Sequence, residues 1–269
     1  MKKKGPATGA GEIAKAVTGV ARRRHVPYSL AEKLASQELM KGRKPDDAGK
    51  EVKGRLHQVM LSFEAGSDRM AGLAGAFKQA GADRASLLQA AGSGLMLHSS
   101  TKERMGFMAE LYRFAFDGMS PGKVLDLACG LNPLALPWMG LPSDVEYLAV
   151  DASGACGEAV EAFFKSWGIN GRFLQMDLSS CFPAGRFDVA LLLKALPTLD
   201  RIEEGLGMGC LERVDAGTAV VSFPTRSMGG ADKGMASFYG GAFEEHASQR
   251  GWSYDRAEFP NELVYRVRK

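Results

Sequence analysis

Before about residue 117, apolar residues recur every three or four positions, a spacing typical of amphipathic helices. This pattern predicts helices over residues 28–40, 48–63, 69–80, 83–91 and 101–116. Ser29 is expected to cap the first of them, with Glu32 as its capping-box partner. The first dozen residues are rich in Lys, Gly and Ala and are expected to be mobile. The front third of the chain is therefore predicted to be all-helical.

After residue 117, short apolar runs alternate with helical stretches such as 155–167 and 200–213. The runs predict strands at residues 123–129, 147–150, 172–176, 187–193, 218–223 and 263–267. Strands that alternate with helices indicate a mostly parallel, doubly wound sheet. We therefore expect an α/β protein with a helical domain over residues 1–95 and a sheet domain over residues 96–269.

Composition narrows the class of protein further. The longest apolar runs are too short to span a membrane, and no apolar segment follows the basic residues at the N-terminus as in a secretory signal. The cysteines, at positions 129, 156, 181 and 210, lie too far apart for a zinc motif or a disulfide framework. We expect a cytoplasmic protein with reduced thiols and no metal site, and nothing in the sequence suggests more than a monomer.

Charge is distributed unevenly along the chain. Residues 1–60 hold 14 Lys and Arg against 6 Asp and Glu, whereas the net charge of the whole chain is only +3. A basic front part followed by a mildly acidic remainder suggests that the front part meets a polyanion. A solvated charged face on small helices explains the charge alone equally well.

Acidic residues end three successive predicted strands. Asp126 lies in VLDLACG, Asp151 ends YLAVD 25 residues later, and Asp177 ends FLQMD. The carboxyl ends of parallel strands meet at one edge, where open α/β sheets bind ligands. Asp151 is placed to accept hydrogen bonds from both ribose hydroxyls, and Asp177 to meet an adenine edge. The pattern favours a cofactor that contains an adenosyl group.

The turn after the first strand distinguishes two such cofactors. NAD needs a glycine-rich turn for its pyrophosphate, but ACGLNP has a single glycine, Gly130. S-adenosylmethionine has no phosphate and carries a methionyl carboxylate, which a nearby cation would bind. Arg104, in the helix before the first strand, is the candidate for that contact. The sequence therefore favours S-adenosylmethionine.

Four segments resemble the aminoglycoside-resistance 16S rRNA (guanine-N7) methyltransferases in order and spacing. They are HSSTKER (98–104), LACGLNPLALPWMG (127–140), LLKALP (192–197) and VSFPTRSMGGADKGM (221–235). The resemblance covers about residues 50–269 and includes the closing ELVYRV. It implies a class I, Rossmann-like methyltransferase sheet with a helical N-terminal extension.

The resemblance also implies a cofactor site for S-adenosylmethionine. Relatives often carry glutamine where this chain has Ile202 and Glu203. The implied cofactor residues are Phe63, His98, Ser99, Ser100, Arg104, Ala128, Gly130, Asp151, Asp177, Leu178, Leu193 and Ile202.

Basic residues are expected to meet the RNA. Lys194 either contacts the target base or RNA backbone or caps a carboxylate, and the resemblance favours substrate contact for Arg226. Neither is expected to act as a general acid or base. The residues expected to bind RNA are Arg22, Arg23, Arg24, Lys41, Arg43, Lys44, Lys53, Arg55 and Lys233.

The resemblance implies methylation of nitrogen-7 of guanine 1405 in helix 44 of 16S rRNA, within the 30S subunit. The expected outcome is resistance to 4,6-linked deoxystreptamine aminoglycosides. Two other enzymes remain as alternatives, an rRNA methyltransferase that acts on a nearby adenine N1 and a small-molecule methyltransferase. A non-catalytic ribosome-binding protein is the alternative from another class.

Overall fold

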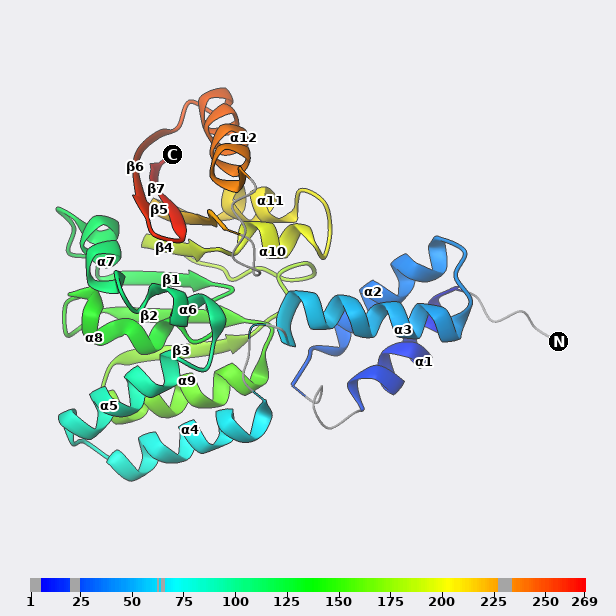
Figure 1. Cartoon of the computed structure of the whole chain (residues 1–269), viewed down its shortest axis with the longest axis horizontal. Helices are drawn as coiled ribbons and strands as arrows, with labels where there is room; N and C mark the ends of the chain where they lie inside the picture. The colour runs from blue at the N-terminus through cyan, green and yellow to red at the C-terminus, as the bar shows by residue number, and fades with distance from the viewer. Residues whose placement is uncertain (1–5, 20–24, 62, 64–65, 227–233) are drawn as a thin grey trace.

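The computed structural model describes residues 6–19, 25–61, 63, 66–226 and 234–269 (Figure 1). Four of the residues expected to bind RNA lie outside this part of the chain, namely Arg22, Arg23, Arg24 and Lys233. In the described part, no helix has both the length and the apolar character that a bilayer crossing requires.

A seven-stranded sheet forms the centre of the molecule, in the order β3-β2-β1-β4-β5-β7-β6. Strands β1 to β5 are parallel, whereas β7 pairs antiparallel with both β5 and β6. The chain moves outward from β1 to β3 and then returns to place β4 on the other side of β1. The strands are β1 (Lys123–Leu127), β2 (Glu146–Asp151), β3 (Asn170–Gln175), β4 (Phe187–Leu193), β5 (Ala216–Pro224), β6 (Ser253–Phe259) and β7 (Glu262–Arg268).

The helices surround this sheet. The bounds are α1 (Pro6–Thr18), α2 (Tyr28–Met40), α3 (Pro45–Leu56), α4 (Ser67–Ala80), α5 (Arg84–Leu95), α6 (Ser99–Arg104), α7 (Met108–Phe116), α8 (Leu136–Met139), α9 (Gly154–Trp167), α10 (Leu196–Asp200), α11 (Leu206–Arg213) and α12 (Met235–Gln249). A π-helical turn, η2 (His57–Leu61), continues α3, and a 3-10 turn, η3 (Asn132–Ala135), precedes α8.

Both faces of the sheet are buried, which explains the nearly continuous apolar runs of the central strands. In β4, Val189 and Leu191 join the apolar cluster that contains α4, α5, α7 and α9. Ala190 and Leu192 join the cluster on the opposite face, which contains α10, α11 and α12. Side chains therefore alternate between two cores with the period of two that a strand imposes.

Helices α1, α2 and α3 pack on one another and form an arm. Figure 1 shows the arm extending from the edge of the sheet at which the arrows of β2 and β3 end. Helix α1 begins at Pro6, so the expectation of a mobile first dozen residues is wrong for the described part of that segment. Ser29 does not cap α2; its Oγ donates to Oδ2 of Asp177, beyond β3, at 3.1 Å.

Three elements were missed and one helix is divided. The sequence pattern does not predict α1, α12 or β6, and β6 is half-buried with a weak alternation. The expected helix 101–116 is broken at residues 105–107 into α6 and α7. Helices α4 and α5 belong to the apolar cluster of α9 and the sheet. A boundary at residue 95 stays a prediction, and by packing only α1 to α3 form the arm.

A buried carboxylate holds the arm together. Glu38 on α2 accepts from Nζ of Lys41 at 2.8 Å, from Nε of Arg43 at 2.7 Å and from Arg55 at 3.0 Å. Burial would raise the pKa of Glu38, but these cations outweigh burial and lower it. Arg55 also donates to the backbone oxygens of Arg201 and Ile202. It thereby ties the arm to the segment after α10.

We expect an Arg55→Ala variant to lose stability. The substitution removes one donor from the buried Glu38 and one donor each from the backbone oxygens of Arg201 and Ile202, although the Ile202 oxygen still accepts from Gln37. Loss of a partner by a buried polar group costs about 1–3 kcal/mol. Urea denaturation would measure the loss. The matched control is Lys53→Ala, on the same helix but exposed, which should change stability by less than about 0.5 kcal/mol. Equal stability of both variants would contradict the role given to Arg55.

Candidate active site

A tight turn follows β1 and faces the end of β2. Ala128 and Gly130 have positive φ angles of 52° and 51°. A Cβ atom on Gly130 would lie 2.7 Å from Nε2 of His98, so glycine alone fits beside this ring. A non-glycine residue with positive φ is strained, and such strain concentrates at functional sites. The turn is therefore shaped for close approach of another group.

Asp151 closes this turn from the end of β2. Its Oδ2 accepts from the backbone N–H of Gly130 and its Oδ1 from that of Ser153, each at 2.8 Å. Burial raises the pKa of Asp151, against the opposing effect of these hydrogen bonds. A carboxylate has about four lone-pair sites, so capacity remains for two further donors. The side chain lines a cavity from which hydroxyl groups can reach it.

His98 and Phe63 lie opposite Asp151. Their rings are stacked, with centroids 6.0 Å apart. Nδ1 of His98 is buried and has no hydrogen-bond partner among the described residues. Burial and the nearby charge of Arg104 lower the pKa of His98 to about 4, so that the ring is neutral at pH 7. Because buried polar atoms in native structures are nearly always paired, Nδ1 of His98 is available to bond a ligand or a water molecule.

Two cavities adjoin at this edge of the sheet. The smaller measures 60 Å³ and lies by the turn after β1 and the ends of β2 and β4. The larger measures 350 Å³ and lies among α6, α10, α12 and the end of β5. Phe63, Ser100, Lys194 and Thr198 line both. The smaller cavity lies where the strand order reverses, which is the usual ligand position in such sheets.

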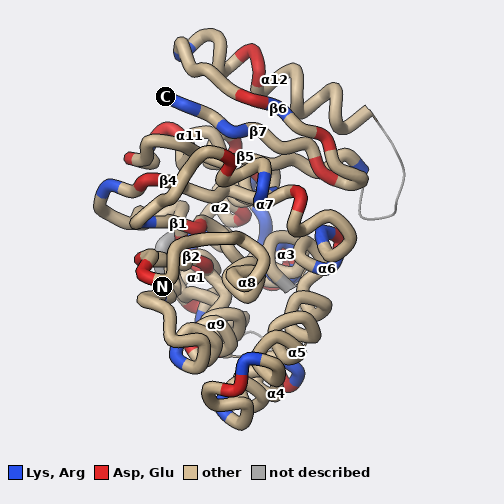
Figure 2. Tube along the Cα trace, turned by 90° about the vertical axis from the view of Figure 1, so that its left-hand side faces the viewer, with Lys and Arg blue, Asp and Glu red and all other residues tan. Residues whose placement is uncertain are grey.

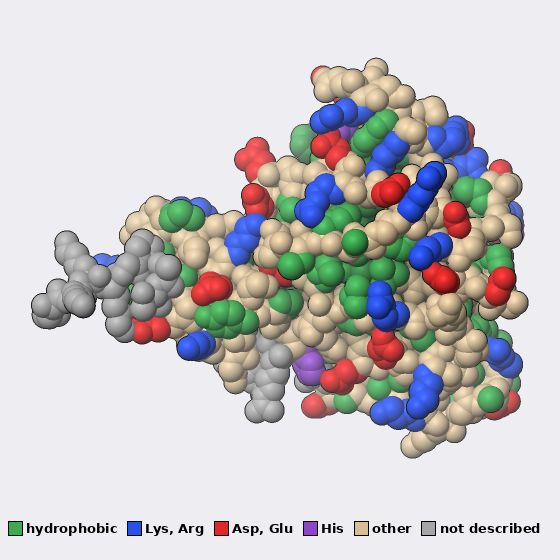
Figure 3. Space-filling view, turned by 180° about the vertical axis from the view of Figure 1, so that it is seen from behind, with side chains coloured by type: hydrophobic (Ala, Val, Ile, Leu, Met, Phe, Trp, Pro, Cys, Tyr) green, Lys and Arg blue, Asp and Glu red, His purple; other side chains and the backbone are tan. Residues whose placement is uncertain are grey.

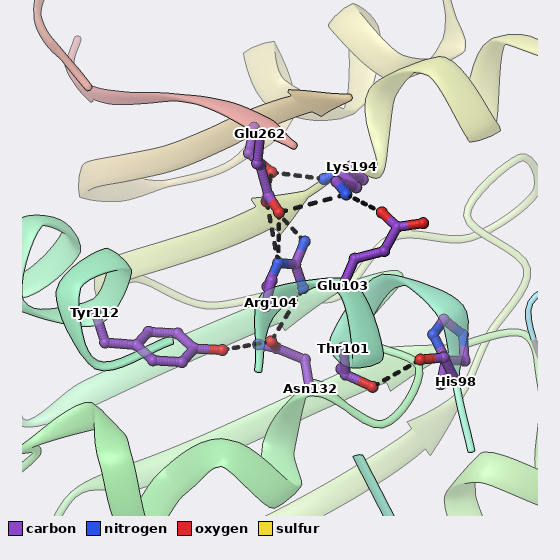
Figure 4. Close-up of polar contacts among 9 residues, drawn as sticks. His98, Thr101, Glu103, Arg104, Tyr112, Asn132, Lys194 and Glu262 are labelled. Atoms are coloured by element: carbon purple, nitrogen blue, oxygen red, sulfur yellow. Dashed lines mark hydrogen bonds and ion pairs between the residues drawn. The ribbon is translucent and has the colours of Figure 1, made fainter. Parts of the chain in front are cut away.

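A network of charged side chains joins α6 to the end of β4 and the start of β7, and it includes Lys194, which lines both cavities (Figure 4). Arg104 donates to both carboxylate oxygens of Glu262, with Nε 2.8 Å from Oε2 and Nη2 2.8 Å from Oε1. Nζ of Lys194 lies 3.5 Å from the same carboxylate and 2.6 Å from Glu103 on α6. The hydroxyl of Ser222 donates to Glu262 as well. Burial alone would raise the pKa of Glu262, but Arg104 and Lys194 lower it.

The network continues through amide and phenol groups toward β1. Oδ1 of Asn132 accepts from Arg104 and from the hydroxyl of Tyr112, while its amide donates to Asp126 at 2.9 Å. Tyr147 donates to the same oxygen of Asp126 at 2.7 Å. Burial raises the pKa of Asp126 to about 7 in spite of these donors. Asp126 therefore bonds to Asn132, which follows the turn after β1, and it lines neither cavity.

The structure brings half of the predicted cofactor residues to the smaller cavity. These are Phe63, His98, Ser100, Ala128, Asp151 and Leu193. Gly130 forms the adjoining turn, while Ser99 lines the larger cavity together with the predicted target-base residues Lys194 and Arg226. Lys194, left open between substrate contact and carboxylate capping, contacts the carboxylates of Glu103 and Glu262.

Besides Gly130, four predicted cofactor residues lie outside both linings. The guanidinium of Arg104 is occupied by Glu262. Asp177 accepts from Ser29 of the arm and from the hydroxyls that follow it in the chain. Leu178 and Ile202 belong to the apolar core, and the backbone oxygen of Ile202 accepts from Arg55. In the structure these four side chains contact other protein groups near the smaller cavity. A direct contact between them and the cofactor stays a prediction.

Three basic residues of the arm form ion pairs within it. Lys41, Arg43 and Arg55 share the carboxylate of Glu38, and Arg55 is only 16% exposed. Lys41 and Arg43 are 60% and 45% exposed, and RNA contact by these residues stays a prediction. Lys44 and Lys53 are exposed and have no ion-pair partner among the described residues. Figure 2 shows basic positions at the α4–α5 end and near β7 as well, and in Figure 3 they are interspersed with acidic ones.

Comparison with known proteins identifies the family. A model of the ribosomal RNA methyltransferase (FmrO) family matches residues 20–266. The chain belongs to this family. It is 37% identical to the 16S rRNA (guanine(1405)-N(7))-methyltransferase of Frankia casuarinae over 88% of this chain and 86% of that protein. It is 34% identical to the enzyme of that name from Micromonospora rosea over 96% of each chain.

Solved structures agree with this family assignment. The 16S rRNA methyltransferase RmtF, in complex with S-adenosyl-L-homocysteine, matches with a TM-score of 0.83 at 32% identity, over 97% of this chain and 98% of that one. The 16S rRNA methylase RmtB matches with a TM-score of 0.81 at 25% identity over the same shares. The expected family and methyltransferase fold are thus confirmed.

Sequence analysis of this methyltransferase missed Glu262 and Glu103. Glu262 is the acid that opens the apolar strand ELVYRV, and a lone charge beside a buried strand was the available signal. Its partners, Arg104 and Lys194, are 158 and 68 residues away in the sequence. No local spacing could therefore show the contact.

We expect a Glu262→Gln variant of this methyltransferase to be about 3–5 kcal/mol less stable at pH 7. The substitution keeps the shape but leaves Arg104 and Lys194 buried without their counter-charge. The pKa of Glu262 in the folded state lies below its ordinary 4.5, so its ionisation stabilises the fold above that pH. The stabilisation is lost as the pH falls, and the difference from the parent should narrow below about pH 4.5.

Urea denaturation at several pH values would measure this difference. Glu146→Gln is the matched control, because Glu146 forms an exposed ion pair with Lys123 and should contribute about 1 kcal/mol or less. A difference for Glu262→Gln that stays constant down to about pH 3 would contradict the assigned ionisation.

Proposed function

We propose that this chain transfers the methyl group of S-adenosylmethionine to N7 of guanine 1405 in 16S rRNA, within the 30S subunit of the cytoplasmic ribosome. The observation that carries the proposal is the pair of adjoining cavities with four shared lining residues. A methyl donor in the smaller cavity and a base in the larger one would meet at Phe63, Ser100, Lys194 and Thr198. The names of the relatives support both the substrate and the position.

The residues around the smaller cavity fit the cofactor. Asp151 has acceptor capacity for the ribose hydroxyls, and Gly130 leaves room beside its backbone. The unpaired Nδ1 of His98 offers a further polar contact. At 60 Å³ the cavity is smaller than typical ligand sites of about 300–1,000 Å³, so the stacked Phe63 and His98 must separate to admit the cofactor.

Methyl transfer to N7 of guanine requires the protein mainly to position the methyl donor and the target base. S-adenosylmethionine supplies a methyl group that is already activated on a sulfonium. N7 of guanine carries a lone pair and no proton, so no residue has to remove one. The neutral His98 and the paired Lys194 are consistent with a site that orients its substrates and has no general base. The target base must leave its helix to enter the cavity.

The larger cavity favours guanine over adenine. Glu103 lines it with a carboxylate, which can accept from N1–H and the N2 amino group of guanine. Adenine presents an acceptor at N1 and would be repelled. Arg201 and Arg226 supply donors for the O6 acceptor. Trp138, Trp167 and Trp252 are absent from the described lining, so no tryptophan is available there to stack on a base.

Expression in a susceptible bacterium tests the proposed function. The chain should give resistance to gentamicin and kanamycin, and mass mapping of 16S rRNA should locate one new methyl group on guanine 1405. A methyl group on adenine would support the alternative enzyme, and labelled methyl transfer to a small molecule but not to 30S subunits would contradict the proposal.

An Asp151→Ala variant should lose both resistance and cofactor binding. Two hydrogen bonds to a charged acceptor correspond to about 100-fold or more in affinity for S-adenosylhomocysteine, which calorimetry would measure. Asp144→Ala, which removes an exposed aspartate between β1 and β2, is the matched control and should bind normally. Retained affinity in Asp151→Ala would exclude the assigned ribose contact.

A Glu103→Gln variant should methylate 30S subunits about 10–100-fold less efficiently, with unchanged affinity for S-adenosylhomocysteine. The amide keeps one acceptor but offers a donor to the guanine edge. The second substrate is a 30S subunit reconstituted with inosine in place of the target guanine, because inosine lacks the N2 amino group. The parent enzyme should lose efficiency on inosine, and the variant should lose less. Additive losses would show that Glu103 does not contact this edge.

A further inference from the structure

Phe238, in the first turn of α12, exposes an aromatic ring to solvent. Its side chain is 71% exposed, more than any other aromatic side chain among the described residues. Leaving such a ring in water forfeits apolar burial. No packing within the described part of the chain accounts for a phenylalanine at this position. Contact between this ring and another molecule would account for it.

One aromatic contact connects Phe238 to the core. Phe238 meets Tyr239 edge-on, with centroids 5.3 Å apart, and Tyr239 stacks on Phe223 at 5.5 Å and 13°. Phe223 in turn packs against Phe243 and Tyr265 in the core. A row of contacting rings therefore runs from the core to the exposed ring of Phe238.

The ring lies beside the larger cavity. Met235 and Tyr239, one helical turn apart on α12, line that cavity, and the ring of Phe238 contacts that of Tyr239. Arg226, from the end of β5, lines the same wall, and Arg201 lines the cavity from the segment after α10. The cavity mouth thus combines an exposed ring with two cations. This combination suits a nucleic acid, whose bases stack and whose phosphates pair with arginine.

We propose that Phe238 stacks on an RNA base next to the target guanine and fills the space that the guanine leaves when it is extruded. The inference rests on the proposed function, because it requires a base in the larger cavity. Proteins that bind unpaired nucleotides stack aromatic side chains on the bases in this manner, a contact that an aliphatic side chain does not make. Stacking on the exposed ring stabilises the extruded state and leaves the cofactor cavity untouched.

Single-turnover methylation of 30S subunits tests the inference. Phe238→Ala should lower the efficiency on the order of tenfold, the size of one base–aromatic stack. Phe238→Trp should retain activity, and Phe238→Leu should resemble the alanine variant because leucine cannot stack. Leu88→Ala, an exposed apolar residue on α5 away from both cavities, is the matched control. Affinity for S-adenosylhomocysteine and urea stability should be unchanged in all four variants.

Methylation of a second substrate distinguishes stacking by Phe238 from a purely structural role of this residue. In reconstituted subunits that lack the base opposite the target guanine, extrusion is already easier. There the loss caused by Phe238→Ala should shrink to less than about threefold. Full activity of Phe238→Ala, an equal loss on both substrates, or rescue by leucine would overturn the inference. Absence of methylation by the parent chain would overturn the proposed function as well, whereas the other outcomes concern Phe238 alone.

Discussion

Glu262 is an ionised carboxylate in the interior, and the arrangement of the site depends on its partners. It pairs with Arg104 from α6 and Lys194 from the end of β4, and it accepts from Ser222 on β5. Each of these elements forms a wall of the two cavities. A charge is tolerated at this depth only when opposite charges and donors surround it. The network therefore fixes three segments, distant in sequence, in one relative position.

This arrangement places strain where the substrates are expected. Lys194 has a φ angle of 57° directly after β4, and Ala128 has a similar angle directly after β1. The backbone N–H of Lys194 donates to Ser222, while its ammonium group contacts Glu103 and Glu262. The surrounding contacts thus hold conformations that an isolated chain would avoid. Both strained residues line the smaller cavity, at the reversal of strand order.

Much of the fold follows from local pattern, whereas the partners of charged residues do not. The apolar run of β4 and the acid that ends β2 were visible in the sequence; the run predicted the strand correctly, and the acid, Asp151, lines the smaller cavity. Strand β6 was not predicted because it lies at the edge of the sheet and buries few side chains, so the alternation of apolar and polar residues along it is weak. Arg104 was expected to face a ligand because cations beside a cofactor site are usually exposed to it. Its partner Glu262 is 158 residues away, beyond any local signal.

In the arm, too, the sequence did not show which charged residues pair with one another. Its excess of Lys and Arg suggested a polyanion surface, yet three of these side chains surround the buried Glu38. A cation that neutralises an internal carboxylate contributes less to the outer field than its formal charge suggests. Arg55, which also binds the oxygens of Arg201 and Ile202, joins the arm to the segment that carries Arg201 into the larger cavity. The exposed Lys44 and Lys53 therefore lie on an arm that is connected through Arg55 to the lining of the larger cavity.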